Sequence, residues 1–263
     1  MLQVYSLASG SAGNCIYIKY GETSFLVDAG ISYHRIKKAI ASLGDSIDAL
    51  QGVLITHDHS DHTRGVEGLL KKHTIPVYTT LATATVLYAS SPCRERMTAC
   101  VRTVDFGYSY DVGEVYFIPF PTPHDAAGSV GFRIVCPNGD TIGIATDVGC
   151  VTSQVAKGLT GCNVVILESN HDPDMLWTGP YPSHLKKRVA SDVGHLSNQA
   201  CGELLSTLIK TGTTDVALFH LSKENNTERI AMETVRCAII GCGEDPDKVC
   251  IKIAKEKETV QVV

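Results

Sequence analysis

The sequence contains no apolar run of about eighteen residues, the length that a membrane-spanning helix needs. Its first residues, MLQVYSLASGSAGN, lack the basic region and the continuous apolar stretch of a secretory signal peptide. We therefore expect a cytoplasmic protein that makes no membrane contact. The formal net charge of −5 also excludes a global positive field, so any site for a polyanion must be local.

Disulfide and repeat signals are missing as well. Ten cysteines are present, but none of them forms a Cys-x-x-Cys pair. In a reducing compartment we expect most of them to be buried thiols that pack as small apolar side chains. The sequence has no low-complexity tract, linker or short repeat, which predicts a single domain over residues 1–263.

Short apolar runs alternate with amphipathic segments along the chain. Strands are expected at residues 3–9, 14–20, 23–30, 52–57, 76–80, 114–120, 129–136, 141–147, 163–169, 215–220 and 248–254. Helices are expected at 32–44, after His62, at 81–90, and from about Ser197 and Asn226. Two strand-rich blocks, each flanked by helices, predict an α/β sandwich with two central sheets that helices cover on both outer faces.

Residues 56–62, THDHSDH, end one of the apolar runs with three histidines and two aspartates. Imidazole and carboxylate groups are ligands of zinc, manganese and iron. His57 and His59 can point the same way from an extended turn and share one metal ion. Asp61 and His62 can face a second ion where the chain turns into a helix. The pattern therefore predicts a metal site at this strand end.

The pattern His-x-His-x-Asp-His after an apolar strand resembles the signature of the metallo-β-lactamase superfamily. The resemblance covers nearly the whole chain and implies a four-layer αβ/βα sandwich with two mixed sheets between helices. It also implies that Asp28, in FLVDAG, holds the histidine loop by hydrogen bonds without binding metal.

The same resemblance implies two divalent metal ions, zinc, manganese or iron, and a set of ligands for them. The implied ligands are His57, His59 and His124 for the first ion, Asp61, His62 and His220 for the second, and Asp147 as a bridge. Two such ions can hold both an attacking hydroxide and the oxygens of a substrate, and they lower the pKa of bound water toward neutrality.

His195, in GHLSNQACGELL, and Glu168, in NVVILES, resemble the extra histidine and glutamate of the superfamily's phosphodiesterases that are similar to the tRNA 3′-processing nuclease. A carboxylate orients an imidazole and keeps it protonated, so that it can donate a proton to a leaving oxygen or steady the phosphate charge. Together with Asp61 they are the expected catalytic groups. The alternative for His195 is that it only caps the helix that begins near Ser197.

The segments SGSAGN, ESNHD, GHLSN and HLSKENN resemble the YycJ/WalJ branch, small bacterial enzymes assigned as DNA exonucleases acting from the 5′ end. The short span between Asp147 and His195 leaves no room for the inserted domain of the β-CASP RNA-processing nucleases. The expected function is a two-metal phosphodiesterase, an exonuclease on DNA rather than RNA, in which metal-held hydroxide attacks phosphate. A small-molecule phosphodiester or thioester hydrolase is the alternative, and a non-catalytic binding protein is the third hypothesis.

Four polar residues are candidate substrate contacts. The segment SGSAGN can cradle a phosphate through backbone N–H groups and Ser11 or Asn14, or it can be only a glycine-rich hairpin turn. Ser197 is a candidate at the start of its helix. Asn225 either touches the substrate or, with Asn226, caps the helix that follows.

Two more segments have a functional and a structural interpretation. HLKKR (184–188) either meets a nucleic-acid backbone or forms a solvated helix face. Trp177, in an expected loop, and Tyr181 can stack a base. His171 and Asp172 are expected to line the pocket beside Glu168.

Overall fold

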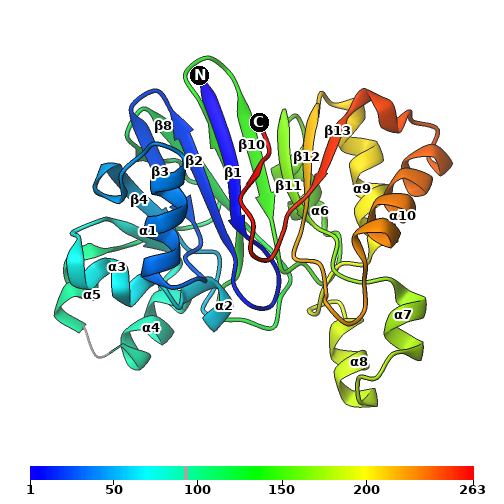
Figure 1. Cartoon of the computed structure of the whole chain (residues 1–263), viewed down its shortest axis with the longest axis horizontal. Helices are drawn as coiled ribbons and strands as arrows, with labels where there is room; N and C mark the ends of the chain where they lie inside the picture. The colour runs from blue at the N-terminus through cyan, green and yellow to red at the C-terminus, as the bar shows by residue number, and fades with distance from the viewer. Residues whose placement is uncertain (92–93) are drawn as a thin grey trace.

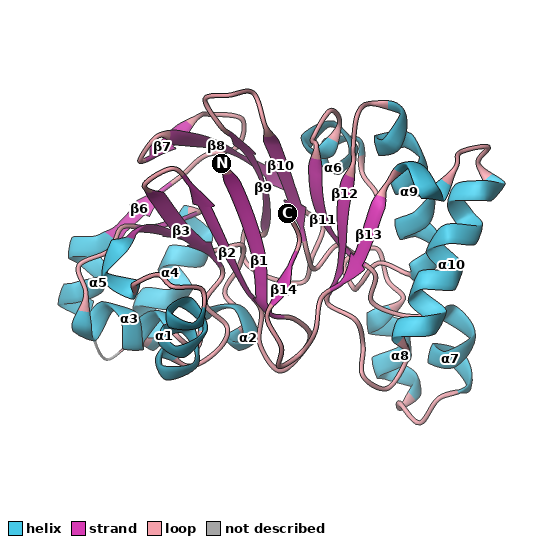
Figure 2. Cartoon of the chain, turned by 45° about the horizontal axis from the view of Figure 1, so that its top comes forward, coloured by secondary structure: helices cyan, strands magenta, loops and turns pink. Residues whose placement is uncertain are grey.

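The computed structural model describes residues 1–91 and 94–263. Its strands form two seven-stranded sheets that lie face to face, and helices pack on their outer faces (Figures 1 and 2). This arrangement confirms the predicted four-layer αβ/βα sandwich. Within the described ranges, no helix is long and apolar enough to cross a membrane.

The first sheet has the strand order β14-β1-β2-β3-β4-β5-β6. Its strands are β1 (Leu2–Ala8), β2 (Cys15–Tyr20), β3 (Thr23–Val27), β4 (Leu50–Leu54), β5 (Val77–Thr79), β6 (Val101–Thr103) and β14 (Val260–Gln261). β1 to β3 are antiparallel, whereas β3 to β6 run parallel, so the sheet is mixed. The helices on this side are α1 (Tyr33–Ser42), α3 (Val66–Lys72), α4 (Leu81–Ser90) and α5 (Arg94–Cys100), with the short α2 (Ser60–Thr63) after β4 and the 3-10 turn η1 (Ile47–Ala49) before it.

The second sheet has the order β13-β12-β11-β10-β9-β8-β7. Its strands are β7 (Tyr110–Val112), β8 (Val115–Pro121), β9 (Val130–Val135), β10 (Thr141–Ala145), β11 (Val164–Glu168), β12 (Asp215–Phe219) and β13 (Cys250–Ile253). β10 to β13 are parallel and β7 to β10 antiparallel. The helices of this half are α6 (Ser153–Leu159), α7 (Pro173–Thr178), α8 (Ser183–Val189), α9 (Asn198–Lys210) and α10 (Glu228–Gly241), and the 3-10 turn η2 (Pro246–Lys248) precedes β13.

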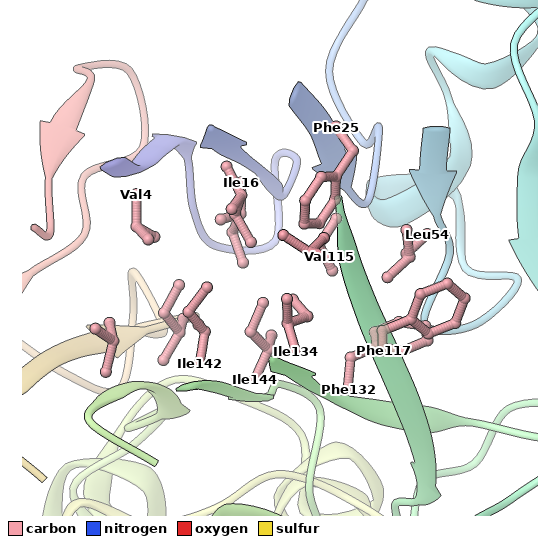
Figure 3. Packing of buried hydrophobic residues seen from close by; sticks show 14 of the residues in the cluster. Val4, Ile16, Phe25, Leu54, Val115, Phe117, Phe132, Ile134, Ile142 and Ile144 are labelled. Atoms are coloured by element: carbon pink, nitrogen blue, oxygen red, sulfur yellow. The ribbon is translucent and has the colours of Figure 1, made fainter. Parts of the chain in front are cut away.

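The main core lies between the two sheets (Figure 3). Val4, Ile16 and Phe25 extend from the first sheet, and Ile142 and Ile144 lie opposite them on the second. β10 and β11 are buried along their whole length because helices cover the face that does not meet the first sheet. Burial of each such aliphatic side chain contributes roughly 1.5–3 kcal/mol to folding. The packed sheets therefore give the strand ends a rigid frame.

Several expectations about local structure need correction. Trp177 lies in helix α7 rather than in a loop, because Asp172 caps that helix and Pro173 begins it. Helix α10 is capped by Thr227, which accepts from the backbone N–H of Ile230, and not by Asn225 or Asn226. The Asn226 Oδ1 accepts instead from Asn198 Nδ2 and from the backbone N–H of Thr227. The short elements α5, α6, β6, β7 and β14 were not predicted.

The cysteines only partly follow the prediction of buried thiols. The buried ones are Cys15, Cys100, Cys136, Cys162 and Cys201, whereas Cys237, Cys242 and Cys250 are exposed. All cysteines in the described ranges are free, and Cys93 lies outside them.

Candidate metal centre and active site

The candidate site lies where strand ends from both sheets meet. Asp28 follows β3, His57 follows β4, His124 follows β8, Asp147 follows β10, Glu168 ends β11 and His220 follows β12. The carboxyl ends of parallel strands gather at one edge of a sheet, which is where ligands bind in α/β proteins. The packing of the sheets then brings both sets of strand ends together.

The backbone is unusual at three of these positions. In the described part of the chain, the residues other than glycine with positive φ are Asp28 (61°), Asp147 (56°) and His220 (57°). This left-handed conformation costs about 1–3 kcal/mol and persists only where the surroundings enforce it. The backbone N–H of His220, for example, donates to Ser9 Oγ at 2.8 Å. Strain is thus concentrated at residues with candidate chemistry.

His57, His59 and His124 form the first cluster, with ring nitrogens within 4.8 Å of one another. His124 Nε2 lies 3.3 Å from His59 Nδ1, and His124 Nδ1 lies 3.1 Å from the carbonyl oxygen of Gly194. His57 Nε2 is buried and has no hydrogen-bond partner among the described residues. Burial, followed by the charge of His62, holds the pKa of His57 well below its usual value, which favours the neutral, metal-binding form.

Asp61, His62 and His220 form the second cluster. Asp61 Oδ2 lies 3.6 Å from His62 Nε2 and 3.5 Å from His220 Nε2. His220 Nε2 is also buried without a hydrogen-bond partner in the described structure. His62 Nδ1 donates to Asp28 Oδ2 at 2.7 Å, which turns Nε2 toward Asp61 and Asp147.

Asp28 and Asp58 fix the loop that carries these histidines. Asp28 is buried and accepts from both the backbone N–H and the hydroxyl of Thr56, at 2.9 and 3.0 Å. Asp58 Oδ1 accepts from the backbone N–H of Ala127 at 3.1 Å, so it ties the loop of His57 to the loop of His124. Asp28 therefore fixes the loop that follows the first sheet, and Asp58 joins that loop to the one that carries His124 from the second sheet.

Asp147 lies between the two clusters. Its Oδ2 is 3.1 Å from His62 Nε2, and its Oδ1 is 3.8 Å from His124 Nε2 and 3.6 Å from His220 Nδ1. Burial opposes ionisation of this carboxyl, but the charges of His220 and His62 outweigh it and hold the pKa well below the usual value. An ionised carboxylate at this position can face both clusters at once.

Glu168 and His195 form an ion pair at the edge of the site. His195 Nδ1 donates to Glu168 Oε1 at 2.8 Å. Burial disfavours the charge of Glu168, yet the charge of His195 and its hydrogen bond lower the carboxyl pKa to about 2. Burial likewise opposes the His195 cation, but Glu168 outweighs it and raises the pKa of His195. Each group therefore stabilises the ionised form of the other.

The candidate substrate contacts differ in their surroundings. Asn14 is buried in the site, where its Nδ2 lies 2.9 Å from His62 Nε2 and its Oδ1 accepts from the backbone N–H of Gly10. Ser11 is exposed at the tip of the same turn. Asn225 is fully buried and donates to Ser222 Oγ, away from solvent.

Ser197, rather than His195, caps helix α9. Its Oγ accepts from the backbone N–H of Ala200 at 3.2 Å. The capping alternative for His195 is therefore wrong, because its ring is paired with Glu168. In helix α8, Lys186 donates to the carbonyl oxygen of Trp177 and Arg188 pairs with Asp125, so this basic segment is partly engaged within the chain.

Sequence reasoning missed a buried network of asparagines behind the site. Asn226 Nδ2 donates to the carbonyl oxygens of Ser169 and Asn170, at 3.0 and 2.9 Å, and Asn198 Nδ2 donates to Asn226 Oδ1 at 3.0 Å. Asn170 Nδ2 in turn donates to the carbonyl oxygen of His220 at 2.8 Å. The only signal in the sequence was the recurrence of asparagine in ESN, LSN and ENN.

Histidine and carboxylate clusters at the strand ends of a four-layer sandwich define a metal-dependent hydrolase. A family model described as "Beta-lactamase superfamily domain" matches residues 23–221. The chain is 33% identical over 232 residues to the exodeoxyribonuclease YycJ of Bacillus anthracis, covering 87% of this chain and 86% of the relative. It is 32% identical to the exodeoxyribonuclease WalJ of Streptococcus pneumoniae serotype 2, and the match covers 87% of this chain and 85% of the relative. The chain belongs to the metallo-β-lactamase superfamily, in the branch of YycJ and WalJ.

Solved structures agree on the fold. The metallo-β-lactamase fold protein YhfI from Bacillus subtilis superimposes with a TM-score of 0.71 at 16% identity and covers 99% of both chains. The short form of human tRNase Z gives a TM-score of 0.66 at 17% identity, again over 99% of both chains. At these identities the likeness concerns the fold alone.

Proposed function

We propose that the chain is a two-metal phosphodiesterase that degrades DNA as an exonuclease from the 5′ end. The observation that carries the proposal is the Glu168–His195 ion pair, 2.8 Å long, beside two clusters of metal-ligand side chains. The exodeoxyribonuclease names of the YycJ and WalJ relatives support a nuclease and DNA as its substrate. Residues 1–263 would act as one domain, because the core between the sheets draws on both halves.

Divalent metal ions fit the donor set of the site. The buried Nε2 atoms of His57 and His220 lack partners in the described structure, and Asp61 and Asp147 offer anionic oxygens beside them. We assign the ligands as follows: His57, His59 and His124 to one ion, Asp61, His62 and His220 to the other, and Asp147 between them. Zinc, manganese and iron all accept such ligands. When bound, two ions supply a nucleophile at neutral pH and stabilise charge on phosphoryl oxygens.

The chain's own residues would prepare the proton transfer. Glu168 accepts from His195 Nδ1, which leaves the Nε2 proton of the imidazolium for donation to the leaving oxygen. Asp28 fixes the ring of His62 through Nδ1, and Asn14 supports the same ring from the turn between β1 and β2. Asp61 would act both as a ligand and in placing the attacking group. Such a general acid typically contributes a rate factor of about 10²–10⁴.

The test is a panel of end-labelled strands of DNA and RNA, incubated with the purified protein and Mn²⁺ or Zn²⁺. Stepwise release of nucleotides from 5′-phosphorylated DNA is expected, and His59→Ala should abolish it. Parallel assays with bis-p-nitrophenyl phosphate and S-lactoylglutathione separate phosphodiester from thioester hydrolysis. Activity on the thioester alone, with no cleavage of any nucleic acid, would overturn the proposal in favour of the small-molecule hydrolase.

A further inference from the structure

A cavity of about 570 Å³ adjoins His195 and is not used by the metal clusters. It is open to solvent and is bordered by the loop after β10, helices α6 and α7, and the start of helix α9. Residues that line it include Val151, His171, Trp177, His195, Glu203 and Leu204. Its volume lies within the range of about 300–1,000 Å³ that is usual for small-molecule sites.

The walls combine a flat aromatic surface with a few directional polar groups. Trp177 is 53% exposed although it lines the cavity, and Val151 and Leu204 add apolar surface. His171 is only 4% exposed, and its Nδ1 has no hydrogen-bond partner in the described structure. Burial lowers the pKa of His171 to about 4, so the ring is neutral and offers one donor and one acceptor. Aromatic stacking plus such edge contacts suits a nucleobase.

The charged residues of the cavity also favour a nucleobase as its ligand. Its lining, as far as the described residues extend, contains Glu203 but no lysine or arginine, so it does not suit a phosphate group. A second cavity of about 430 Å³, next to Leu221, is lined by two lysines and two glutamates, and Lys255 pairs there with Glu228. The charges in that second cavity balance, so it gives no comparable indication of a ligand.

We propose that the cavity at Trp177 and His171 binds the base of the nucleotide on the leaving-group side of the scissile phosphate. The base would stack on the indole of Trp177, and the His171 ring would hydrogen-bond to its edge. This inference rests on the proposed function, because His195 both lines the cavity and is assigned to the leaving oxygen. The sugar that carries this oxygen would place its base in the cavity.

The chain offers an internal reporter, since Trp177 is its single tryptophan. Titration of the purified protein with dAMP or TMP should quench the tryptophan fluorescence in a saturable way. Deoxyribose 5-phosphate, which lacks a base, should leave the emission unchanged. No quenching by either nucleotide, or equal quenching by the sugar phosphate, would overturn the base site. Because this readout needs no turnover, it can fail or succeed independently of the nuclease activity.

Kinetics of Trp177→Ala give the second measurement. Loss of one stacking contact should raise KM for DNA roughly five-fold or more, since stacking on an aromatic side chain is worth about 1–3 kcal/mol per base. The rise should exceed any change with bis-p-nitrophenyl phosphate, which has no base. Tyr116→Ala is the matched control, because Tyr116 is an exposed aromatic residue on β8 outside the cavity. Equal KM values for Trp177→Ala and the wild type on DNA would refute the assignment even in an active nuclease.

Discussion

At the scale of single residues, Glu168 contacts both His195 and His220, which begin the two copies of the tripeptide HLS at residues 195–197 and 220–222. Its Oε1 accepts from His195 Nδ1 and lies 3.0 Å from His220 Nδ1. Its Oε2 accepts from the backbone N–H groups of Val148 and Leu196. A single buried carboxylate therefore influences both a proposed metal ligand and the proposed proton donor.

Glu168→Gln keeps the shape of the side chain but removes its charge. His195 must be protonated to donate a proton, so activity should fall as the pH rises through its pKa. Glu168 raises that pKa, and its neutralisation should move the alkaline limb of the kcat profile to lower pH. We also expect kcat near neutral pH to fall by about 10²-fold or more. A profile that keeps its alkaline limb unchanged would contradict the role of the pair.

His220→Ala and His195→Ala should both lose activity, but for different reasons. His220 belongs to the second cluster, where its Nε2 lies 3.5 Å from Asp61 Oδ2, so its removal should reduce the bound metal by about one ion per chain. His195 faces Glu168, so its removal should keep the metal content and lower mainly kcat. Elemental analysis of the purified variants, alongside their kinetics, distinguishes the two. Equal metal loss in both variants would count against the division of roles.

At the scale of elements, the strands that deliver the ligands could be predicted from the sequence, because buried strands read as apolar runs that end in a polar residue. The metal ligands themselves were recognised from a motif. The short helices α6 and α7 could not be predicted, because six or seven residues are too few for a helical period to stand out. For the same reason Trp177 was expected in a loop.

Segments of the chain also approach each other closely at glycine residues, and the closest approach is at Gly30. A Cβ atom at this position would lie 1.5 Å from the carbonyl oxygen of Asp61, which also accepts from the backbone N–H of Asn14. Gly30→Ala should therefore displace the start of helix α2, lower metal affinity and reduce Tm. Gly241→Ala is the control, because it lies in helix α10 with open space around it and should be neutral or slightly stabilising. Metal titration and thermal melting check both variants, and an unaltered Gly30→Ala protein would disprove the steric argument.

At the scale of the whole molecule, the proposed ligands come from both sheets. His57 and His59 follow the first sheet, whereas His124, Asp147 and His220 follow the second. The contacts between them could not be predicted from the sequence, since they depend on how separate segments pack. The link from Glu168 to His220 is an example, because 52 residues separate the two.

Metal removal should consequently loosen the sandwich as a whole. A ligand that binds only the folded state stabilises it by mass action, by about 2.7 kcal/mol at a hundred times its Kd. The chelator-treated protein should have a lower Tm, and Zn²⁺ or Mn²⁺ should restore it in a concentration-dependent manner. Scanning calorimetry measures both. An identical Tm with and without metal would mean that the ions do not connect the two halves.

The asparagine network has a consequence for motion. It joins the loops after β11 and β12 to the start of helix α9, and backbone hydrogen bonds from Asn170 to Leu196 and from Ser222 to Asn170 reinforce it. These loops should therefore fluctuate together as one cooperative unit, and their amide protons should exchange with deuterium nearly as slowly as those of the strands. Asn226→Ala should release the protection in all three segments at once. The network would thus hold Glu168 and His195 in their paired arrangement before a substrate binds.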